Sequence, residues 1–202
     1  MTTETARIEA FSDGVFAIAI TLLILEIRVP LPAAGALGPQ LWKQWPSYIS
    51  FVISFAFIGI MWINHHRLFT HIRRSDNGLL LLNLLLLLGV TFVPYPTAVL
   101  ATHLGQRDQR LAAIFFNGTF FFIAIFFNLL WRYATASKRH LLAHDVDIAA
   151  IEKITRQFAF GPLPYLVCLV LAWVSVTASL ALNILLACFF ALPPDFGRGR
   201  KP

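Results

Sequence analysis

The chain has 202 residues, of which 58% are hydrophobic and only 13% are charged. Soluble domains carry about 25% charged residues, so this sequence lacks the charge to cover a surface facing water. Composition therefore excludes a cytosolic enzyme and a disulfide-rich secreted domain, and it indicates an integral membrane protein. The formal net charge of +6 fits basic loops at lipid headgroups better than a nucleic-acid partner. The two cysteines, Cys168 and Cys188, lie inside apolar runs, so we expect no metal framework and no cofactor.

Apolar runs long enough to cross a bilayer, about 20 residues each, recur along the chain. The predicted spans are residues 10–27, 45–63, 79–100, 111–131, 158–174 and 178–192. The last two come from one apolar run, 158–192, which is too long for a single crossing. Its middle holds the polar residues Ser175, Thr177 and Ser179, so we expect a tight turn there. We predict an all-α membrane protein in which residues 1–202 form one six-span domain.

The basic residues predict the orientation of these spans. With the N-terminus in the cytoplasm, twelve Lys and Arg fall in cytoplasmic segments and four in outer loops, which fits the positive-inside rule. The cytoplasmic set is Arg7, Arg67, Arg73, Arg74, Arg132, Lys138, Arg139, Lys153, Arg156, Arg198, Arg200 and Lys201, and the outer set is Arg28, Lys43, Arg107 and Arg110. Both termini are then cytoplasmic. The polar segment 134–157 is predicted to be a cytoplasmic linker with a short helix, since Ile148, Ile151 and Ile154 recur at helical spacing. A cleaved signal peptide is disfavoured, because Glu9 and Asp13 lie where such a peptide carries positive charge.

The first span carries an apolar stripe with a single hydroxyl. An α-helix turns about 100° per residue, so with Ile18 set to zero Leu22 lies at about +40° and Leu25 at about −20°. Thr21 lies beside them at about −60°, whereas Asp13 lies at about −140° and points toward whatever helices support this one. The stripe by itself also fits a surface packed against lipid or other helices. Asp13 by itself also fits a helix cap.

A second polar cluster ends the second span, at the depth of Asp13. It consists of Trp62, Asn64, His65 and His66. We expect one of the two histidines to contact Asp13, because a carboxylate inside a membrane protein needs a partner. Adjacent residues on a helix point about 100° apart, so these histidines are not expected to share a metal ion.

These residues resemble a known family. Arg7, three further residues, and then Phe11, Ser12 and Asp13 match the Arg-x-x-x-Phe-Ser-Asp signature of the transmembrane protein 175 family, potassium-permeable channels of endosomes and lysosomes with bacterial relatives. The cluster at the end of the second span is also similar to that family. The resemblance implies a homotetramer of six-helix subunits in which the first helices line a central pore.

The resemblance also assigns roles to the stripe. It implies that Ile18 is the narrowest apolar position, that Leu22 and Leu25 form further apolar layers, and that Thr21 forms a hydroxyl layer. Arg7, Phe11, Ser12 and Asp13 would support the pore helix, together with Trp62, Asn64, His65 and His66. An apolar constriction gates by dewetting, and a ring of hydroxyl oxygens replaces part of an ion's hydration shell. Glu26 falls near the outer mouth, where acids concentrate cations, although a solvated helix end is the simpler interpretation.

The sequence thus predicts a potassium-permeable cation channel in a bacterial plasma membrane, with potassium and other monovalent cations as its partners. Selectivity is expected to be weak, since the chain has one repeat where animal members of the family fuse two, and it has no Thr-Val-Gly-Tyr-Gly filter.

Other functions remain as alternatives. The main one is a proton-coupled secondary transporter with Asp13 and His65 or His66 as its relay, and another is a membrane protein that conducts nothing. An intramembrane enzyme is disfavoured, because no nucleophile, base and orienting acid fall at one membrane depth. A metal site at His140 and His144 with Asp145 or Asp147 is also disfavoured against a solvated helix face.

Overall fold

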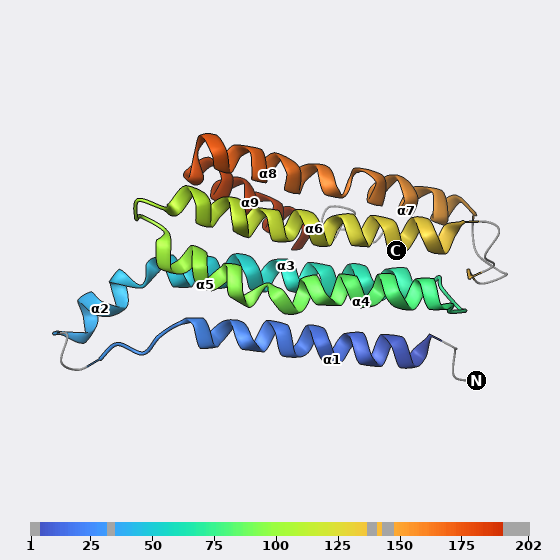
Figure 1. Ribbon diagram of the computed structural model, residues 1–202, viewed down its shortest axis with the longest axis horizontal. Coiled ribbons are helices and arrows are strands. Elements are labelled where there is room, and N and C mark those ends of the chain that lie inside the picture. Colours follow the sequence, from blue (N-terminus) through green and yellow to red (C-terminus); the bar gives the residue numbers. More distant parts are fainter. Residues whose placement is uncertain (1–4, 32–34, 137–140, 143–147, 192–202) are drawn as a thin grey trace, which may run out of the picture.

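The computed structural model describes residues 5–31, 35–136, 141–142 and 148–191, and in these ranges every named element is a helix (Figure 1). Two extended residues, Ile72 and Leu142, form an isolated antiparallel bridge. The helices are α1 (Ala6–Leu22), the 3-10 helix η1 (Leu23–Glu26), α2 (Leu37–Lys43), α3 (Trp45–Phe69), α4 (Asn77–Phe92), α5 (Pro94–His103), α6 (Gln109–Thr135), α7 (Ile148–Phe160), α8 (Pro162–Val174) and α9 (Val176–Ala191).

The helices pack side by side as a bundle with α1 at one edge. α1 packs against α3 and α4, and α6 packs against α4, α5 and α8 (Figure 1). The start of α1, the α3–α4 connection, the end of α6 and the start of α7 lie at one end of the bundle, here called the inner end. α2, the α5–α6 connection and the α8–α9 connection lie at the opposite, outer end.

This arrangement separates the two predicted sets of basic residues. Arg7, Arg67 and Arg132 belong to segments at the inner end, whereas Arg28 and Lys43 belong to segments at the outer end. Lys138, Arg139 and the tail residues Arg198, Arg200 and Lys201 lie outside the described residues.

Within the described ranges, five helical stretches are long and apolar enough to cross a membrane, so the chain is a multi-span helical membrane protein. They are Ala6–Glu26, Trp45–Phe69, Asn77–His103, Gln109–Thr135 and Ile154–Val174, and Val176–Phe189 is a shorter apolar helix. The predicted turn within 158–192 is present at Ser175, which is extended between α8 and α9. The Ser175 hydroxyl accepts a hydrogen bond from the Ala178 amide at 3.2 Å and so caps the start of α9.

Two spans differ in detail from the predicted ones. The third is interrupted at Val93, between α4 and α5, because Pro94 has no amide hydrogen to continue the helical ladder. The fifth is preceded by α7, which starts at Ile148, inside the predicted linker 134–157. This segment is helical because it packs on α6, where the Trp131 indole donates a hydrogen bond to the Thr155 hydroxyl at 2.9 Å.

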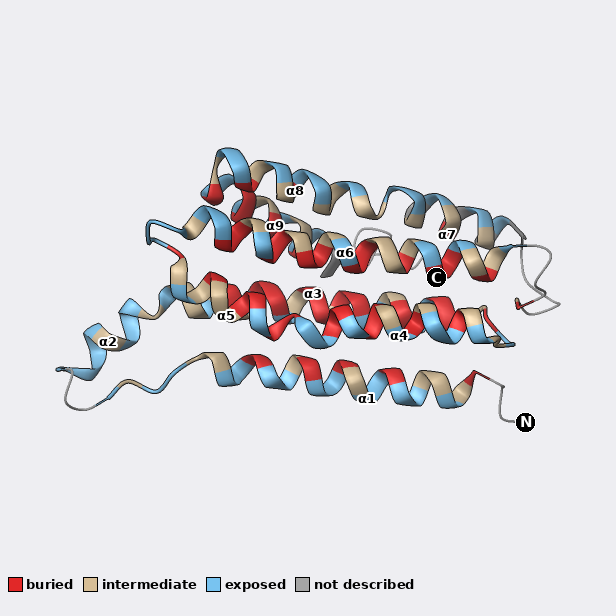
Figure 2. Cartoon of the chain, in the orientation of Figure 1, coloured by how far each residue is buried: buried red, intermediate tan, exposed pale blue. Residues whose placement is uncertain are grey.

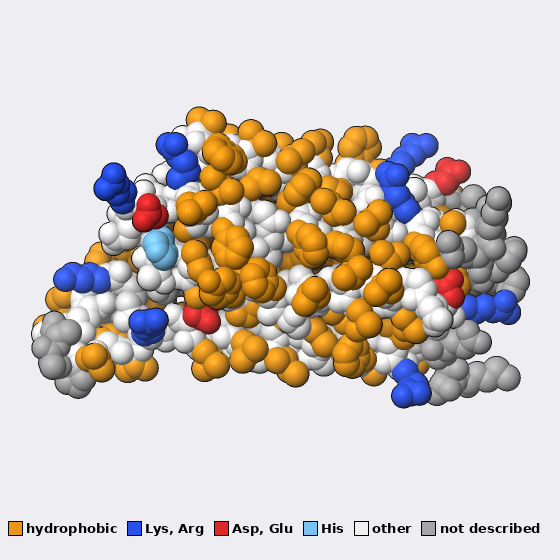
Figure 3. Space-filling model, viewed as in Figure 1, with side chains coloured by type: hydrophobic (Ala, Val, Ile, Leu, Met, Phe, Trp, Pro, Cys, Tyr) orange, Lys and Arg blue, Asp and Glu red, His pale blue; other side chains and the backbone are white. Residues whose placement is uncertain are grey.

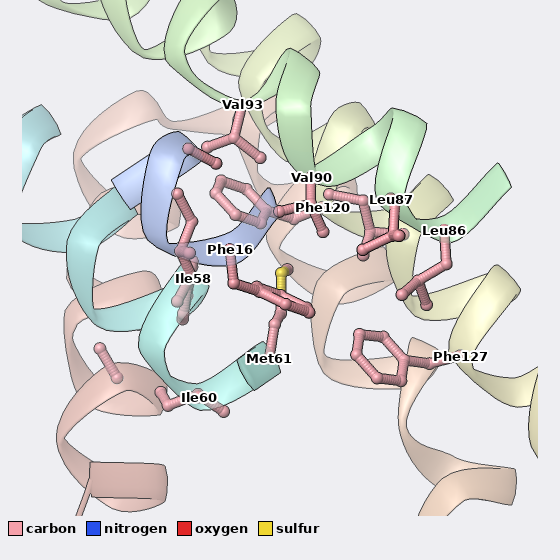
Figure 4. Close-up of a cluster of buried hydrophobic side chains, with 14 of the residues drawn as sticks. Phe16, Ile58, Ile60, Met61, Leu86, Leu87, Val90, Val93, Phe120 and Phe127 are labelled. Carbon is pink, nitrogen blue, oxygen red and sulfur yellow. The ribbon is translucent and has the colours of Figure 1, made fainter. Parts of the chain in front are cut away.

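The core lies where α1, α3, α4 and α6 meet. Figure 4 shows Phe16 of α1 beside Ile58 and Met61 of α3, with Val90 of α4 and Phe120 of α6 nearby. All five side chains are buried. Their packing fixes the rotation of α1 about its own axis, since turning the helix would expose Phe16 and bury another face.

Polar contacts hold the first and last helices to the bundle. At the inner end the Thr5 hydroxyl donates to the Ile72 carbonyl at 3.1 Å, next to the bridge between Ile72 and Leu142. At the far side of the bundle, the Asn117 amide of α6 donates to the Ser179 hydroxyl at 3.1 Å and accepts from the Asn183 amide at 3.0 Å. These buried bonds anchor α9 to α6.

Candidate pore helix and its support

The two faces of α1 differ in burial. Ser12, Phe16 and Ala19 are buried against the bundle, and Leu23 continues this face into η1. On the opposite face Ile18 is 60% exposed, Leu22 41% and Leu25 71%. Figure 2 shows the exposed side of α1 along the edge of the molecule. The predicted stripe is thus left uncovered by the rest of its own chain.

The helix changes geometry just above Thr21. The sequence predicts α-helix through residue 27, but α1 ends at Leu22 and residues Leu23–Glu26 form a 3-10 helix. In a 3-10 helix, with about three residues per turn, positions i and i+3 eclipse each other. Leu25 therefore lies directly above Leu22. In a continued α-helix it would instead be rotated by about 60° from Leu22, to the position at about −20° from Ile18. After Glu26 the chain becomes extended at Ile27.

The Thr21 hydroxyl donates its hydrogen within its own helix. Its hydroxyl donates to the carbonyls of Ala17 and Ile18, each at 2.9 Å, and the side chain is exposed. The hydrogen is therefore used within the helix, and the oxygen lone pairs remain available as acceptors or cation ligands. Glu26 is half-buried and lies at the outer end of η1.

A buried hydrogen-bond chain connects α1 to α3 and α4. His65 of α3 shares a hydrogen bond of 2.9 Å with the Asn83 carbonyl oxygen, the Asn83 amide donates to the Ser12 hydroxyl at 3.1 Å, and Ser12 donates to the Ile8 carbonyl at 2.8 Å. Because the Asn83 amide nitrogen faces Ser12, its oxygen faces His65 and can only accept, so His65 Nε2 is the donor of the first bond. The His65 ring also stacks on Phe69, with ring centroids 4.5 Å apart. This chain fixes α1 at the depth of Ser12.

Asp13 is bound separately. The Trp62 indole donates to its carboxylate at 2.9 Å, on the exposed side of the α1–α3 contact. We expected a histidine in this place, but His65 turns toward α4 and His66 is exposed. The reason is that His65 is buried against Phe16 of α1 and bonded to Asn83 of α4, whereas the exposed Trp62 indole lies at the rim of the α1–α3 contact, next to Asp13.

The remaining predicted support residues are not brought together with this pair. Arg7 and Phe11 are exposed on the single chain. Asn64 lines a small cavity of about 70 Å³ against α6 and α8, on another side of α3. Asn83, in contrast, was missed by sequence reasoning, although a lone amide within the leucine-rich run of α4 was a signal that pointed to it.

The described residues contain no group of three or more His, Cys, Asp or Glu side chains that would hold a metal ion. His140, His144, Asp145 and Asp147, which form the disfavoured metal candidate, lie outside the described residues.

Comparison with known proteins identifies related chains. A family model described as endosomal/lysosomal potassium channel TMEM175 matches residues 7–94, a range that includes every α1, α3 and α4 residue discussed above. A potassium channel of Chamaesiphon minutus is 50% identical over 192 residues, which cover 94% of each chain. The human endosomal/lysosomal proton channel TMEM175 is 34% identical over 158 residues, covering 73% of this chain and 31% of the human one.

A solved structure is similar over nearly the whole fold. The crystal structure of a lysosomal potassium-selective channel TMEM175 homolog from Chamaesiphon minutus superposes with a TM-score of 0.84 at 48% identity. The match covers 93% of this chain and 96% of that one.

Proposed function

Because this chain belongs to the TMEM175 family, we propose that it is a potassium-permeable cation channel that conducts ions passively across the membrane. The observation that carries the proposal is the uncovered apolar stripe of α1, in a chain whose near full-length relative is named a potassium channel. Relatives of this kind are channels, and the proposed role is accordingly not enzymatic.

We place four copies of α1 around a central axis in a homotetramer. In this assembly Ile18, Leu22 and Leu25 of each subunit face the axis, and the buried face with Phe16 stays within its own subunit. The support for this is geometric, since the stripe has no contact that covers it within the chain, whereas the other face of the same helix is fully packed. A lipid-facing stripe is the competing explanation.

The constriction and the hydroxyl layer would then act in sequence. Four Ile18 side chains form a narrow apolar ring that excludes water and ions when closed. One turn above, four Thr21 oxygens replace part of an ion's hydration shell, because their hydrogens are donated to the helix backbone. Glu26 lies at the outer mouth, where four carboxylates raise the local cation concentration.

The support set is proposed to keep this helix in register. The chain from His65 through Asn83 to Ser12 and the bond from Trp62 to Asp13 contact α1 on the two sides of its buried face. Arg7, Phe11 and His66 are free to make contacts in the assembly. Asn64 is proposed to act only through the packing of α3.

We propose that the chain crosses the membrane six times with both termini in the cytoplasm. We further propose that it forms a single membrane domain and lies in the plasma membrane of a bacterium. The support is the division of twelve basic residues against four along the sequence, with Arg7, Arg67 and Arg132 in segments at the inner end and only the four of the outer set at the outer end. Reporter fusions at the two termini test this. An outer C-terminus would mean that α8 and α9 do not make two crossings.

The rival function is a proton-coupled transporter with a relay between Asp13 and His65 or His66. Asp13 accepts its hydrogen bond from Trp62, and His65 shares one with Asn83, so among the described residues no hydrogen bond joins Asp13 to either histidine of the relay. Flux into liposomes under potassium, sodium and impermeant-cation gradients separates the two functions. Passive potassium flux without a proton gradient supports the channel, whereas saturating uptake that requires a proton gradient supports the transporter.

A further inference from the structure

A groove with a volume of about 400 Å³ opens between α5 and the start of α6, at the outer end of the molecule. α5 contributes Tyr95, Val99 and His103 to its walls, and the α6 side contributes Asp108, Leu111 and Phe115. Figure 3 shows hydrophobic side chains over the middle of this face, with charged and histidine side chains gathered at the outer end. The groove is therefore apolar along its length and polar at one end.

The apolar part has an aromatic floor. The rings of Tyr95 and Phe115 meet edge to face with centroids 5.9 Å apart, and Phe92 meets Phe115 in the same way at 5.9 Å. Tyr95 is 59% exposed and Leu111 70% exposed, so this floor faces outward. The helix from Tyr95 to His103 spans about 12 Å, close to half of the roughly 30 Å hydrocarbon core. An acyl chain of one leaflet fits that length.

The polar end carries acceptors and cations side by side. The Nδ1 of His103 is 2.9 Å from the Val99 carbonyl, which can only accept, so Nδ1 is the donor, and in that tautomer Nε2 is an acceptor. Asp108 lines the same end of the groove and is exposed. Arg107 and Arg110 flank Asp108 along the chain and are exposed outside the groove walls.

This alternation of charge matches one kind of lipid headgroup. Two guanidinium groups bind phosphate oxygens, while Asp108 and His103 Nε2 accept hydrogen bonds from an ammonium group. We propose that the groove binds an aminophospholipid of the phosphatidylethanolamine type, with its phosphate at Arg107 and Arg110, its ammonium at Asp108 and His103, and one acyl chain on Tyr95 and Phe115. A choline headgroup has no N–H to donate, and a glycerol headgroup has no cation for Asp108.

The position of the groove favours lipid over a second copy of the chain. The uncovered stripe belongs to α1, which packs against α3 and α4, whereas the groove is lined by residues of α5 and of the start of α6 (Figure 1). The proposed assembly seats neighbouring copies on the α1 stripe, none of whose residues lines the groove, and so leaves the groove to the bilayer. A second copy of the chain in this groove would have to contact α5 and α6 rather than the α1 stripe.

The test uses the full chain purified in detergent. Dioctanoyl phosphatidylethanolamine, phosphatidylcholine and phosphatidylglycerol are titrated separately, and bound lipid is counted by native mass spectrometry. We expect phosphatidylethanolamine to bind at about tenfold lower concentration than the other two, as the gain or loss of one charge-assisted hydrogen bond produces. Equal binding of all three headgroups would overturn the proposal.

Variants locate the site. Tyr95→Ala should weaken binding of all three lipids, Arg110→Gln should weaken phosphatidylethanolamine binding about tenfold, and Asp108→Asn should abolish its advantage over phosphatidylglycerol. Each side chain is exposed, so the unfolding temperature without lipid should not change. Trp173→Ala and Arg28→Gln are matched controls, since both are exposed outside the groove. Controls that reduce binding as much as the groove variants, or groove variants that change the mass of the assembly instead of its lipid content, would refute the site.

Discussion

Replacement of Asn83 by leucine tests the support of α1 most directly. Asn83 is 2% exposed and bonds both His65 and Ser12, so leucine removes an acceptor and a donor at once. His65 Nδ1 already has no partner, and the ring is left with a second unpaired nitrogen. Ser12 loses less, because its hydroxyl still donates to the Ile8 carbonyl at 2.8 Å.

The magnitude follows from the unpaired donor. A buried hydrogen-bond partner left unsatisfied costs about 1–3 kcal/mol, whereas hydrogen bonds between membrane helices average about 0.6 kcal/mol in double-mutant cycles. We therefore expect Asn83→Leu to destabilise the protein by about 1–3 kcal/mol and Ser12→Ala by about 1 kcal/mol or less. For a chain of this size, 1 kcal/mol corresponds to about 2–4 °C in unfolding temperature.

The assay is thermal unfolding of the purified protein, followed by potassium flux in liposomes. Thr91→Val is the matched control on the same helix, since the exposed Thr91 hydroxyl bonds only the Leu88 carbonyl of its own helix. The double variant of Ser12 and Asn83 should cost less than the sum of the single changes, because they share one bond. Additive effects, or an unchanged unfolding temperature in Asn83→Leu, would show that this chain does not hold α1.

Three further predictions concern the stripe and the far helices. Ile18→Asn should raise cation flux into liposomes by wetting the constriction, while Ile24→Asn, off the stripe, should not. If the stripe faces lipid, Ile18→Asn should instead lower expression without adding flux. Thr21→Val should keep the fold and lower the potassium-to-sodium ratio measured from reversal potentials, and an unchanged ratio argues against the hydroxyl layer. Asn117→Leu should destabilise the protein by about 1–3 kcal/mol and speed amide hydrogen exchange in α9 without changing ion selectivity. Exchange in α9 as slow as in the unchanged protein would contradict the proposed anchor.

The helices and the two faces of α1 were predictable because they depend on local composition and on the helical period. Apolar length predicts the spans, and about 100° per residue separates Ile18 from Phe16 and places the latter on the buried face. The break at Ser175 was predictable as well, since a polar residue in the middle of an overlong apolar run marks a turn. These features need no knowledge of which helix lies beside which.

Contacts between helices were not predictable in the same way. The choice of Trp62 over a histidine as the partner of Asp13 depends on the rotation of α3 against α1, which is set by the packing of Phe16, Ile58 and Met61. The 3-10 turn at Leu23–Glu26 also has no local signature, because its apolar residues suit an α-helix equally. The helix within the predicted linker follows from the spacing of Ile148, Ile151 and Ile154, whereas its packing on α6 does not.

The side-chain hydrogen bonds that join the first helix to neighbouring segments all lie toward its inner end. Thr5, Ser12 and Asp13 tie its inner half to neighbouring segments, whereas the described residues from Leu22 to Leu31 make no side-chain hydrogen bond. The outer turn is held by apolar packing instead, with Leu23 buried and η1 against α3 and α5. Apolar contacts are not directional, so Leu25 and Glu26 can shift, and the outer mouth can change its width, while the inner half of the helix keeps its place.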